Sequence, residues 1–200
     1  MRYAPRTNGS GNRNHGHTVL PGKGAPNGWF TMNQITYDLL TKICEKCGGR
    51  CCYYAKPPLT EERISILLDH GMTFDDILFQ SYRKLDTKST GFCVGFRDGK
   101  CKVQGVKPET CVAGPFTFDV RNDKLEIYLK KERLCDLVAF LKNNPEVYQE
   151  QYDLALQSIC HLVKTLPSEE LAEVLKVEES DTDLVGEVPL SEVLSPDSRN

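Results

Sequence analysis

The sequence lacks any long run of apolar residues, and no stretch approaches the roughly 20 residues that a membrane-spanning helix needs. It also lacks a strong charge of either sign, because the net charge is −3 and the isoelectric point is about 5.9. No overall basic excess therefore favours nucleic acid or an anionic membrane. We find no acid pair, Ser-His-Asp order or phosphate-binding loop that identifies an enzyme. We expect a protein that binds neither nucleic acid nor membranes, and the sequence leaves any enzymatic reaction open.

Cysteine is the residue type that the sequence does have in unusual number. The nine cysteines are Cys44, Cys47, Cys51, Cys52, Cys93, Cys101, Cys111, Cys135 and Cys160. An odd number, in a chain without a secretory apolar segment at its start, argues against a secreted disulfide scaffold. We therefore expect reduced thiols and a cytoplasmic location.

The two ends of the chain differ in charge from its middle. Residues 1–28 carry four basic residues and no acid, are rich in Gly, Asn and Pro, and are predicted to be a disordered basic tail. Residues 169–200 hold ten acids against two basic residues, and we predict a disordered acidic tail at 178–200. Between them, residues 29–177 are long enough for one domain with a core, but not for two large ones.

The pattern of apolar residues predicts a small α+β domain with about four to six helices. Helical spacing occurs in residues 33–43, 60–71, 73–85, 132–142 and 145–166, with a weaker pattern after Ser168. Between residues 92 and 129 the spacing changes to two, which is typical of antiparallel hairpins. A two-residue turn at Asn122-Asp123 pairs Val120 with Leu125, Phe118 with Ile127 and Phe116 with Leu129. We expect a helix to cover the apolar face that results.

Four of the cysteines form a compact knuckle in residues 44–52. The Cys44-x2-Cys47 spacing lets two sulfurs reach one metal ion across a tight turn, and Gly48 and Gly49 leave room for backbone amides to approach sulfur. Four cations surround this segment and could compensate anionic thiolates, namely Lys42, Lys46, Arg50 and Lys56. Cys135 and Cys160 instead lie beside apolar helical stripes, where packing is the ordinary explanation.

The knuckle ends in a vicinal pair, Cys51 and Cys52. Adjacent side chains of an extended backbone point to opposite sides, so we expect one of them to serve a second site or to remain free. Three further thiols follow around an Asp-Gly turn signal. A two-residue turn there would place Cys93 and Cys101 on opposite faces, and a three-residue loop with a bulge would place them on one, so joint ligation predicts the bulge.

The spacing C-x2-C-x3-C-C, followed by C-x7-C-x9-C, resembles the YkgJ-like cysteine-cluster family of zinc- or iron-chelating proteins. The domain of that family also occurs in flagellin lysine N-methylases. The family's closing pattern is similar to residues 107–115 of this chain, which keep Pro108, Cys111 and Pro115 but lose two arginines and a phenylalanine. The resemblance implies Cys135 as an eighth family cysteine.

The leading interpretation is a metal-binding protein that coordinates an iron–sulfur cluster or zinc. Its predicted ligands are Cys44, Cys47, Cys51, Cys52, Cys93, Cys101, Cys111 and Cys135. Iron would add one-electron redox chemistry, whereas zinc would hold the knuckle to the hairpin as part of the fold. One alternative is a part in protein lysine N-methylation, which the methylase relatives imply. The other is a metal-delivery or interaction protein whose charged tails recruit a protein partner.

Overall fold

A computed structural model of the protein describes residues 33–179 and 181–195. Its α-helices are α1 (Gln34–Lys46), α2 (Glu61–Asp69), α3 (Glu109–Ala113), α4 (Asp136–Lys142), α5 (Pro145–Thr165), α6 (Ser168–Val174) and α7 (Leu190–Leu194). Its strands are β1 (Ile77–Phe79), β2 (Arg83–Leu85), β3 (Phe96–Arg97), β4 (Lys100–Cys101), β5 (Phe116–Arg121), β6 (Lys124–Lys130) and β7 (Thr182–Pro189). Short 3₁₀ helices are η2 (Arg50–Cys52), η3 (Phe74–Asp76) and η4 (Gln104–Val106).

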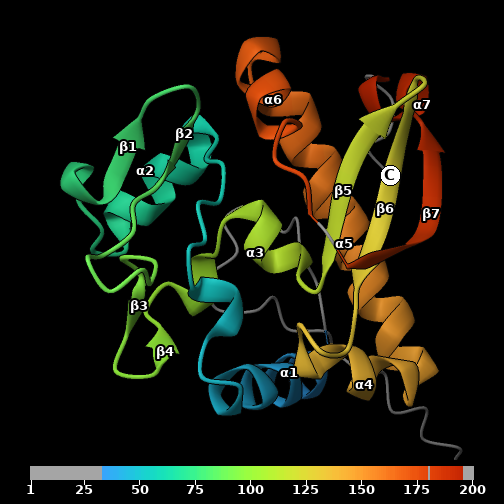
Figure 1. Ribbon diagram of the computed structural model, residues 1–200, viewed down its shortest axis with the longest axis horizontal. Helices are drawn as coiled ribbons and strands as arrows, with labels where there is room; N and C mark the ends of the chain where they lie inside the picture. Colours follow the sequence, from blue (N-terminus) through green and yellow to red (C-terminus); the bar gives the residue numbers. More distant parts are fainter. Residues whose placement is uncertain (1–32, 180, 196–200) are drawn as a thin grey trace, which may run out of the picture.

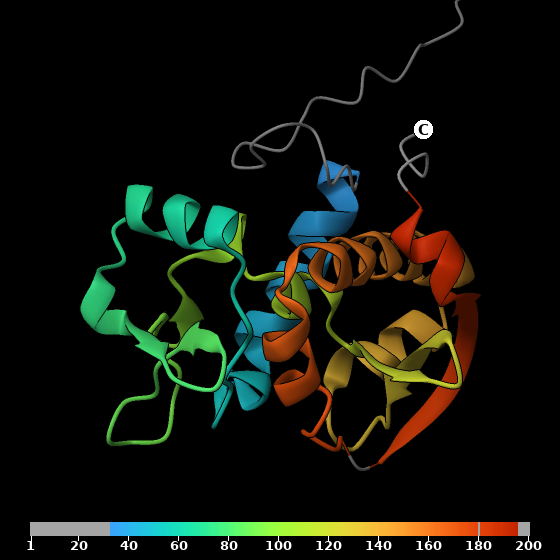
Figure 2. The same cartoon turned by 90° about the horizontal axis from the view of Figure 1, so that it is seen from above.

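The elements form two lobes that lie side by side in both ribbon views (Figures 1 and 2). The large lobe contains the three-stranded sheet β5-β6-β7 with α4, α5, α6 and α7. The small lobe contains α2 and the two-stranded sheets β1-β2 and β3-β4. Helices α1 and α3 lie between them, with α1 packed on α4 and α3 packed on α5. Each lobe has its own hydrophobic core, and the larger core takes in Leu40 of α1 and Ala113 of α3.

Local sequence signals start several of the helices. The side chain of Asn33 accepts a hydrogen bond from the Ile35 N–H at the start of α1, and that of Thr60 accepts one from the Arg63 N–H at the start of α2. Pro145 occupies the first turn of α5, where a backbone N–H would have no partner within the helix, so the N–H that proline lacks is not missed. These signals confirm the predicted starts of α2 and α5.

The hairpin of β5 and β6 is confirmed residue by residue. Phe116 lies opposite Leu129, and the predicted pairs continue through Phe118 and Val120 to the turn. Both turn residues, Asn122 and Asp123, have positive φ, as the favoured two-residue hairpin turn requires. Helix α5 packs against this sheet and completes the larger core, which supplies the covering helix that the pattern demanded.

The predicted helix over residues 73–85 is wrong. The segment makes one 3₁₀ turn, η3, in which the Thr73 N–H and hydroxyl both donate to the Asp76 carboxylate, and then forms the β1-β2 hairpin. Pairing places Ile77 opposite Leu85, and both side chains are buried in the smaller core. The hairpin forms in place of the helix because cross-strand pairing buries Ile77 and Leu85. Phe79, which lies between them in the sequence, stays 58% exposed.

The predicted disordered acidic tail at 178–200 is also wrong over residues 182–194, which form β7 and α7. Strand β7 pairs antiparallel with β6. Its acids pair with lysines in and directly after β6: Lys124 pairs with Glu187 at 2.6 Å, and Lys131 pairs with Asp183. The acidic composition reflects charges neutralised across the sheet, on an edge strand where charged side chains are common.

The remaining predictions have simple outcomes. The α+β class is confirmed, and the described residues form seven α-helices, one more than the predicted range. Helix α4 begins at Asp136, later than predicted, because Cys135 is its N-cap. The predicted basic tail at 1–28 lies outside the described residues. Within the described residues, no helix is both long and apolar enough to cross a membrane.

Candidate metal centre

The knuckle, residues 44–52, begins in the last turn of α1 and ends in η2. Cys47 is the C-cap of α1. Gly48 and Gly49 follow with φ of 71° and 73°, in the left-handed region that favours glycine. A Cβ atom on Gly49 would lie 2.4 Å from Cε2 of Phe96. The chain therefore reverses tightly here, directly against the β3-β4 hairpin.

The hairpin cysteines are tied to the knuckle through the backbone. The Cys93 N–H donates to the Cys52 carbonyl oxygen at 2.8 Å, and the chain then turns, so that the Phe96 N–H donates to the Cys93 carbonyl oxygen at 2.9 Å. The Asp-Gly signal forms a two-residue turn with Phe96 opposite Cys101, and the bulge predicted from joint ligation is not formed in this hairpin. Because Cys93 lies in the turn before β3, the strand register does not decide where its side chain points.

Cys111 lies on α3, whose start is fixed by a buried ion pair. Arg63 of α2 donates through Nε to Glu109 Oε1 at 3.0 Å, and its Nη2 lies 2.9 Å from the same oxygen. The side chains of Arg63 and Glu109 are 8% and 1% exposed. Arg63 Nη1 also donates to the Val106 carbonyl oxygen at 3.3 Å. The pair joins the small lobe to the helix that carries Cys111.

Cys135 is brought to the knuckle by an arginine. Arg50 forms an ion pair with Asp136 and donates to the Arg133 carbonyl oxygen at 3.3 Å, on either side of Cys135. Cys160 is different, because it is half-buried on α5 against the larger core and does not line the space described next. Cys135 also packs against the larger core, but unlike Cys160 it lines that space.

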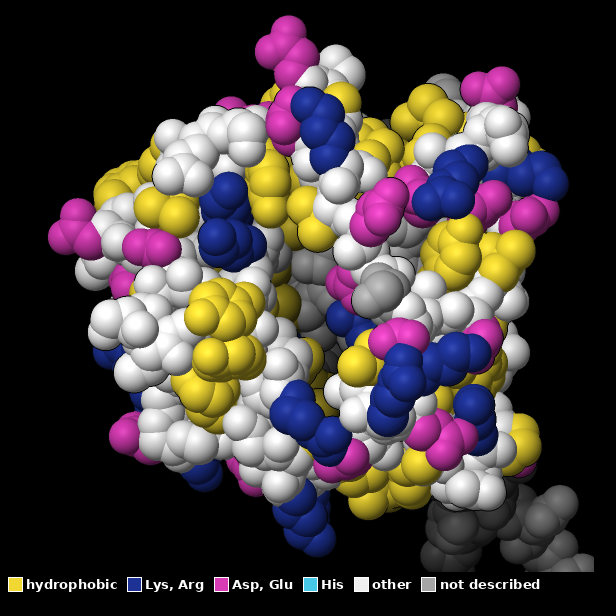
Figure 3. Space-filling view, in the orientation of Figure 1, with side chains coloured by type: hydrophobic (Ala, Val, Ile, Leu, Met, Phe, Trp, Pro, Cys, Tyr) yellow, Lys and Arg dark blue, Asp and Glu magenta, His cyan; other side chains and the backbone are white. Residues whose placement is uncertain are grey.

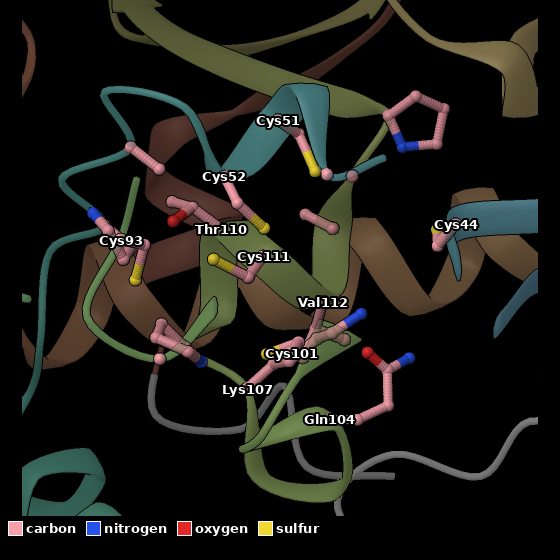
Figure 4. A pocket seen from close by; sticks show the side chains of 18 of the residues that line it. Cys44, Cys51, Cys52, Cys93, Cys101, Gln104, Lys107, Thr110, Cys111 and Val112 are labelled. Carbon is pink, nitrogen blue, oxygen red and sulfur yellow. The ribbon is translucent and has the colours of Figure 1, made fainter. Parts of the chain in front are cut away.

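A cavity of about 1410 Å³ lies between the lobes, and the surface is hollowed there (Figure 3). It is lined by all the cysteines predicted as ligands: Cys44, Cys47, Cys51, Cys52, Cys93, Cys101, Cys111 and Cys135. Figure 4 shows Cys51, Cys52 and Cys111 in the middle, with Cys93 on one side and Cys44 on the other. Among the described residues, no three His, Cys, Asp or Glu side chains converge closely enough to hold one metal ion.

The thiols are nevertheless close enough to influence one another's ionisation. The pKa of Cys44 is raised to about 12, mainly by burial; Lys107 acts to lower it, and the nearby thiols of Cys51 and Cys135 add to the increase. The Cys52 thiol donates a hydrogen bond to the Cys51 sulfur, which lowers the pKa of Cys51 and raises that of Cys52. Cys51 is thus the thiol of this pair that ionises first.

Lys107 is a cavity residue that sequence reasoning missed. It is half-buried, and although burial acts to lower its pKa, the surrounding thiols of Cys44, Cys101, Cys111 and Cys51 raise it overall. The sequence signal was its place four residues before Cys111, where the resembling family has arginine. Of the cations expected from sequence to balance the knuckle, Arg50 is instead engaged by an acid.

The donors that line the cavity fit a soft metal. Thiolate sulfur is the preferred ligand of zinc and of iron–sulfur clusters, and a nearby ammonium group offsets the negative charge of such a site. The acids nearest to the knuckle are engaged by cations, since Asp136 pairs with Arg50 and Glu45 lies 3.8 Å from Lys100. The thiols are therefore the donors most available to a metal.

Comparison with known proteins gives one family match. The model of the CxxCxxCC family, described as "Putative zinc- or iron-chelating domain", matches residues 43–161. This range begins just before the knuckle and ends in α5, so it contains every cysteine that lines the cavity. No curated protein and no solved structure matches the chain.

Proposed function

Because this chain belongs to the CxxCxxCC family of zinc- or iron-chelating domains, we propose that it holds zinc or an iron–sulfur cluster through the cysteines of its cavity. The observation that carries the proposal is the distribution of these residues. Helix α1, η2, the turn before β3, strand β4, helix α3 and the N-cap of α4 each direct at least one thiol to a single space. Core packing alone gives no reason for such a gathering of thiols around a cavity.

Metal binding would draw the thiols closer than they stand in the structure. A zinc–sulfur bond is about 2.3 Å long, so sulfurs around one tetrahedral ion lie about 3.8 Å apart. Structural zinc binds thiolate peptides with apparent free energies of about 10–16 kcal/mol, far more than rotation of a few short side chains requires.

The role of the cavity would depend on which metal it binds. Zinc has no redox chemistry, so four-thiolate zinc would fasten the knuckle to the small lobe and to α3. An iron–sulfur cluster would accept and return single electrons, with a potential set by nearby charge and solvent access. Lys107 would act in both cases as the cation that stabilises the anionic centre.

Anaerobic purification of the full-length chain, followed by metal analysis and visible absorption, tests the proposal. A colourless protein with stoichiometric zinc identifies the zinc form, and a brown protein with iron and acid-labile sulfide identifies the cluster form. The matched pair Cys111→Ala and Cys160→Ala separates ligation from packing, because only the cavity variant should lose metal. A chain that contains neither metal, and takes up neither after reduction and reconstitution, contradicts the proposal.

A further inference from the structure

The cavity cysteines divide into two groups according to the core that supports them. Cys44 packs against the larger hydrophobic core, and so does Cys135. Cys47 directly ends the helix that carries Cys44. The Arg50 contacts to Asp136 and Arg133 hold the knuckle against the Cys135 end of α4. These three thiols therefore face the cavity from the side of the large lobe.

The second group belongs to the smaller core. Cys93 is buried in that core, and Cys52 and Cys101 are packed against it. The backbone hydrogen bond from the Cys93 N–H to the Cys52 carbonyl oxygen holds two of these residues together. Cys111 lies on α3, which packs on α5 of the large lobe and is also joined to the small lobe by the buried Arg63 ion pair, and its thiol lies beside that of Cys52 (Figure 4). With Cys111, the small-lobe group has four thiols.

Cys51 lies at the boundary, and its neighbour Cys52 is already supported by the smaller core. Consecutive residues of a 3₁₀ helix such as η2 leave the backbone about 120° apart, so the two side chains can turn to different sites, although without metal their thiols are hydrogen-bonded to one another. The small-lobe group already has the four thiols of a tetrahedral site, whereas the large-lobe group has three and needs a fourth. Cys51 is the thiol that remains to supply it.

We propose that the cavity contains two separate four-thiolate sites and that the vicinal pair is divided between them. The large-lobe site comprises Cys44, Cys47, Cys51 and Cys135, and the small-lobe site comprises Cys52, Cys93, Cys101 and Cys111. This division rests on the proposed function, since it allocates ligands for a metal that the chain must first bind.

The mutual influence of the thiols agrees with the division. The thiols that raise the pKa of Cys44, after burial, are Cys51, Cys135 and Cys47, all of the large-lobe group. Those that raise the pKa of Cys135, after burial, are Cys51 and Cys47, from the same group.

The small-lobe thiols show the corresponding pattern. Burial raises the pKa of Cys111, and apart from the boundary thiol Cys51 the contributing thiols are Cys101 and Cys93. For Cys93, burial is again the main cause, and Cys101 is the thiol that adds to it. Cys51 influences thiols of both groups, as its place at the boundary requires: it acts on Cys44 and Cys111, and it is the thiol that adds to burial in raising the pKa of Cys101.

Lys107 lies where it can serve both sites. Its ammonium interacts with Cys44 and Cys51 of the large-lobe group and with Cys101 and Cys111 of the small-lobe group. A zinc ion with four thiolates carries a net charge of about −2, so two adjacent sites repel one another. A shared cation between them reduces that repulsion.

Metal stoichiometry is the first test. The full-length chain, reduced and stripped of metal, is reconstituted with zinc or with iron and sulfide, and native mass spectrometry counts the bound units. We expect two zinc ions or two clusters per chain. One unit per chain overturns the division while leaving the proposed function intact, and no bound unit overturns the proposed function itself.

Thiol labelling then tests the ligand sets, in a Cys160→Ala background that removes the packing cysteine. With metal bound, Cys135→Ala should leave one unit and allow alkylation of Cys44, Cys47 and Cys51 only. The matched variant Cys101→Ala should leave one unit and allow alkylation of the remaining small-lobe thiols only. A labelled set that mixes the two groups, or loss of both units from either variant, overturns the division.

A measurement without cavity substitutions covers the case in which those variants do not fold. Metal is removed from the loaded Cys160→Ala chain in steps with a chelator, and the intact mass of the alkylated molecules is recorded at each step. Two sites predict molecules with zero, four or eight labels, with the four-label species mapping to one group. A distribution of only zero and eight labels overturns the proposal.

Discussion

Replacing Glu109 with alanine breaks the buried ion pair that links α2 to the helix carrying Cys111. Glu109 Oε1 accepts from Arg63 at 3.0 Å, whereas Oε2 is buried without a hydrogen-bond partner in the structure. The Glu109 and Arg63 side chains are only 1% and 8% exposed, so solvent screens the pair little. The variant would leave the Arg63 guanidinium buried with one remaining acceptor, the Val106 carbonyl oxygen.

The expected loss is about 3–5 kcal/mol in the free energy of unfolding, which is typical when one partner of a buried ion pair is removed. For a domain of this size that corresponds to a decrease in melting temperature of about 6–20 °C. Glu109→Gln keeps the shape and one acceptor, so its loss should be smaller, about 1.5–3 kcal/mol. Arg63→Met combined with Glu109→Leu should recover most of the loss, because no buried charge then remains unpaired.

Urea unfolding of the metal-free protein, followed by circular dichroism, measures these differences without a contribution from the metal. Glu45→Ala is the control, since Glu45 meets Lys100 at 3.8 Å with both side chains largely exposed, and it should lose less than about 1 kcal/mol. If Glu109→Ala loses no more than this control, or if the double variant is less stable than Glu109→Ala, the assigned role of the buried pair is refuted.

Three further predictions concern the knuckle, the thiols and the core. Gly49→Ala should lower the melting temperature more than Gly48→Ala, because both sites have positive φ but only Gly49 would set a Cβ 2.4 Å from Phe96; equal losses would contradict this geometry. In metal-free protein, burial raises the pKa of Cys44 from 9.0 to about 12, so stability is full below pH 9 and decreases towards pH 12, by at most about 1.4 kcal/mol per pH unit. Urea midpoints between pH 8 and 11 measure the total slope, to which the other buried thiols with raised pKa values also contribute; Cys44→Ala should reduce the slope by the share of one thiol, and zinc should abolish it. Leu125→Ala, at a fully buried position, should lose about 2–5 kcal/mol by urea unfolding, and a loss under 1 kcal/mol would contradict its place in the core.

Features encoded locally could be predicted from the sequence. The β5-β6 hairpin follows from a two-residue turn and an alternating pattern within 14 residues, and its register is confirmed. The thiol set was also readable, because cysteines among glycines and charges have no apolar periodicity to serve. All eight predicted ligands line the cavity, although their role as ligands stays a prediction.

Features that depend on distant partners could not be read in this way. The residues of β1 and β2 carry a pattern compatible with a helix, and only the smaller core decides that Ile77 pairs with Leu85. The acids of β7 meet lysines more than 50 positions earlier in the chain, so their composition resembled that of a solvated tail. Lys107 became visible as a cavity cation only when four elements placed thiols around it.

The position of β7 in the chain has a consequence for the order of synthesis. The large lobe gains its third strand only when residues 182–189 have been made, whereas the knuckle is complete at residue 52. At about 5–20 residues per second, a ribosome needs about 7–28 s to proceed from residue 52 to the end of α7 at residue 194. Through that interval the knuckle thiols belong to a nascent chain whose three-stranded sheet is not yet complete. Protection of these thiols during translation must therefore come from the reducing power of the surroundings or from early capture of metal, and not from the finished fold.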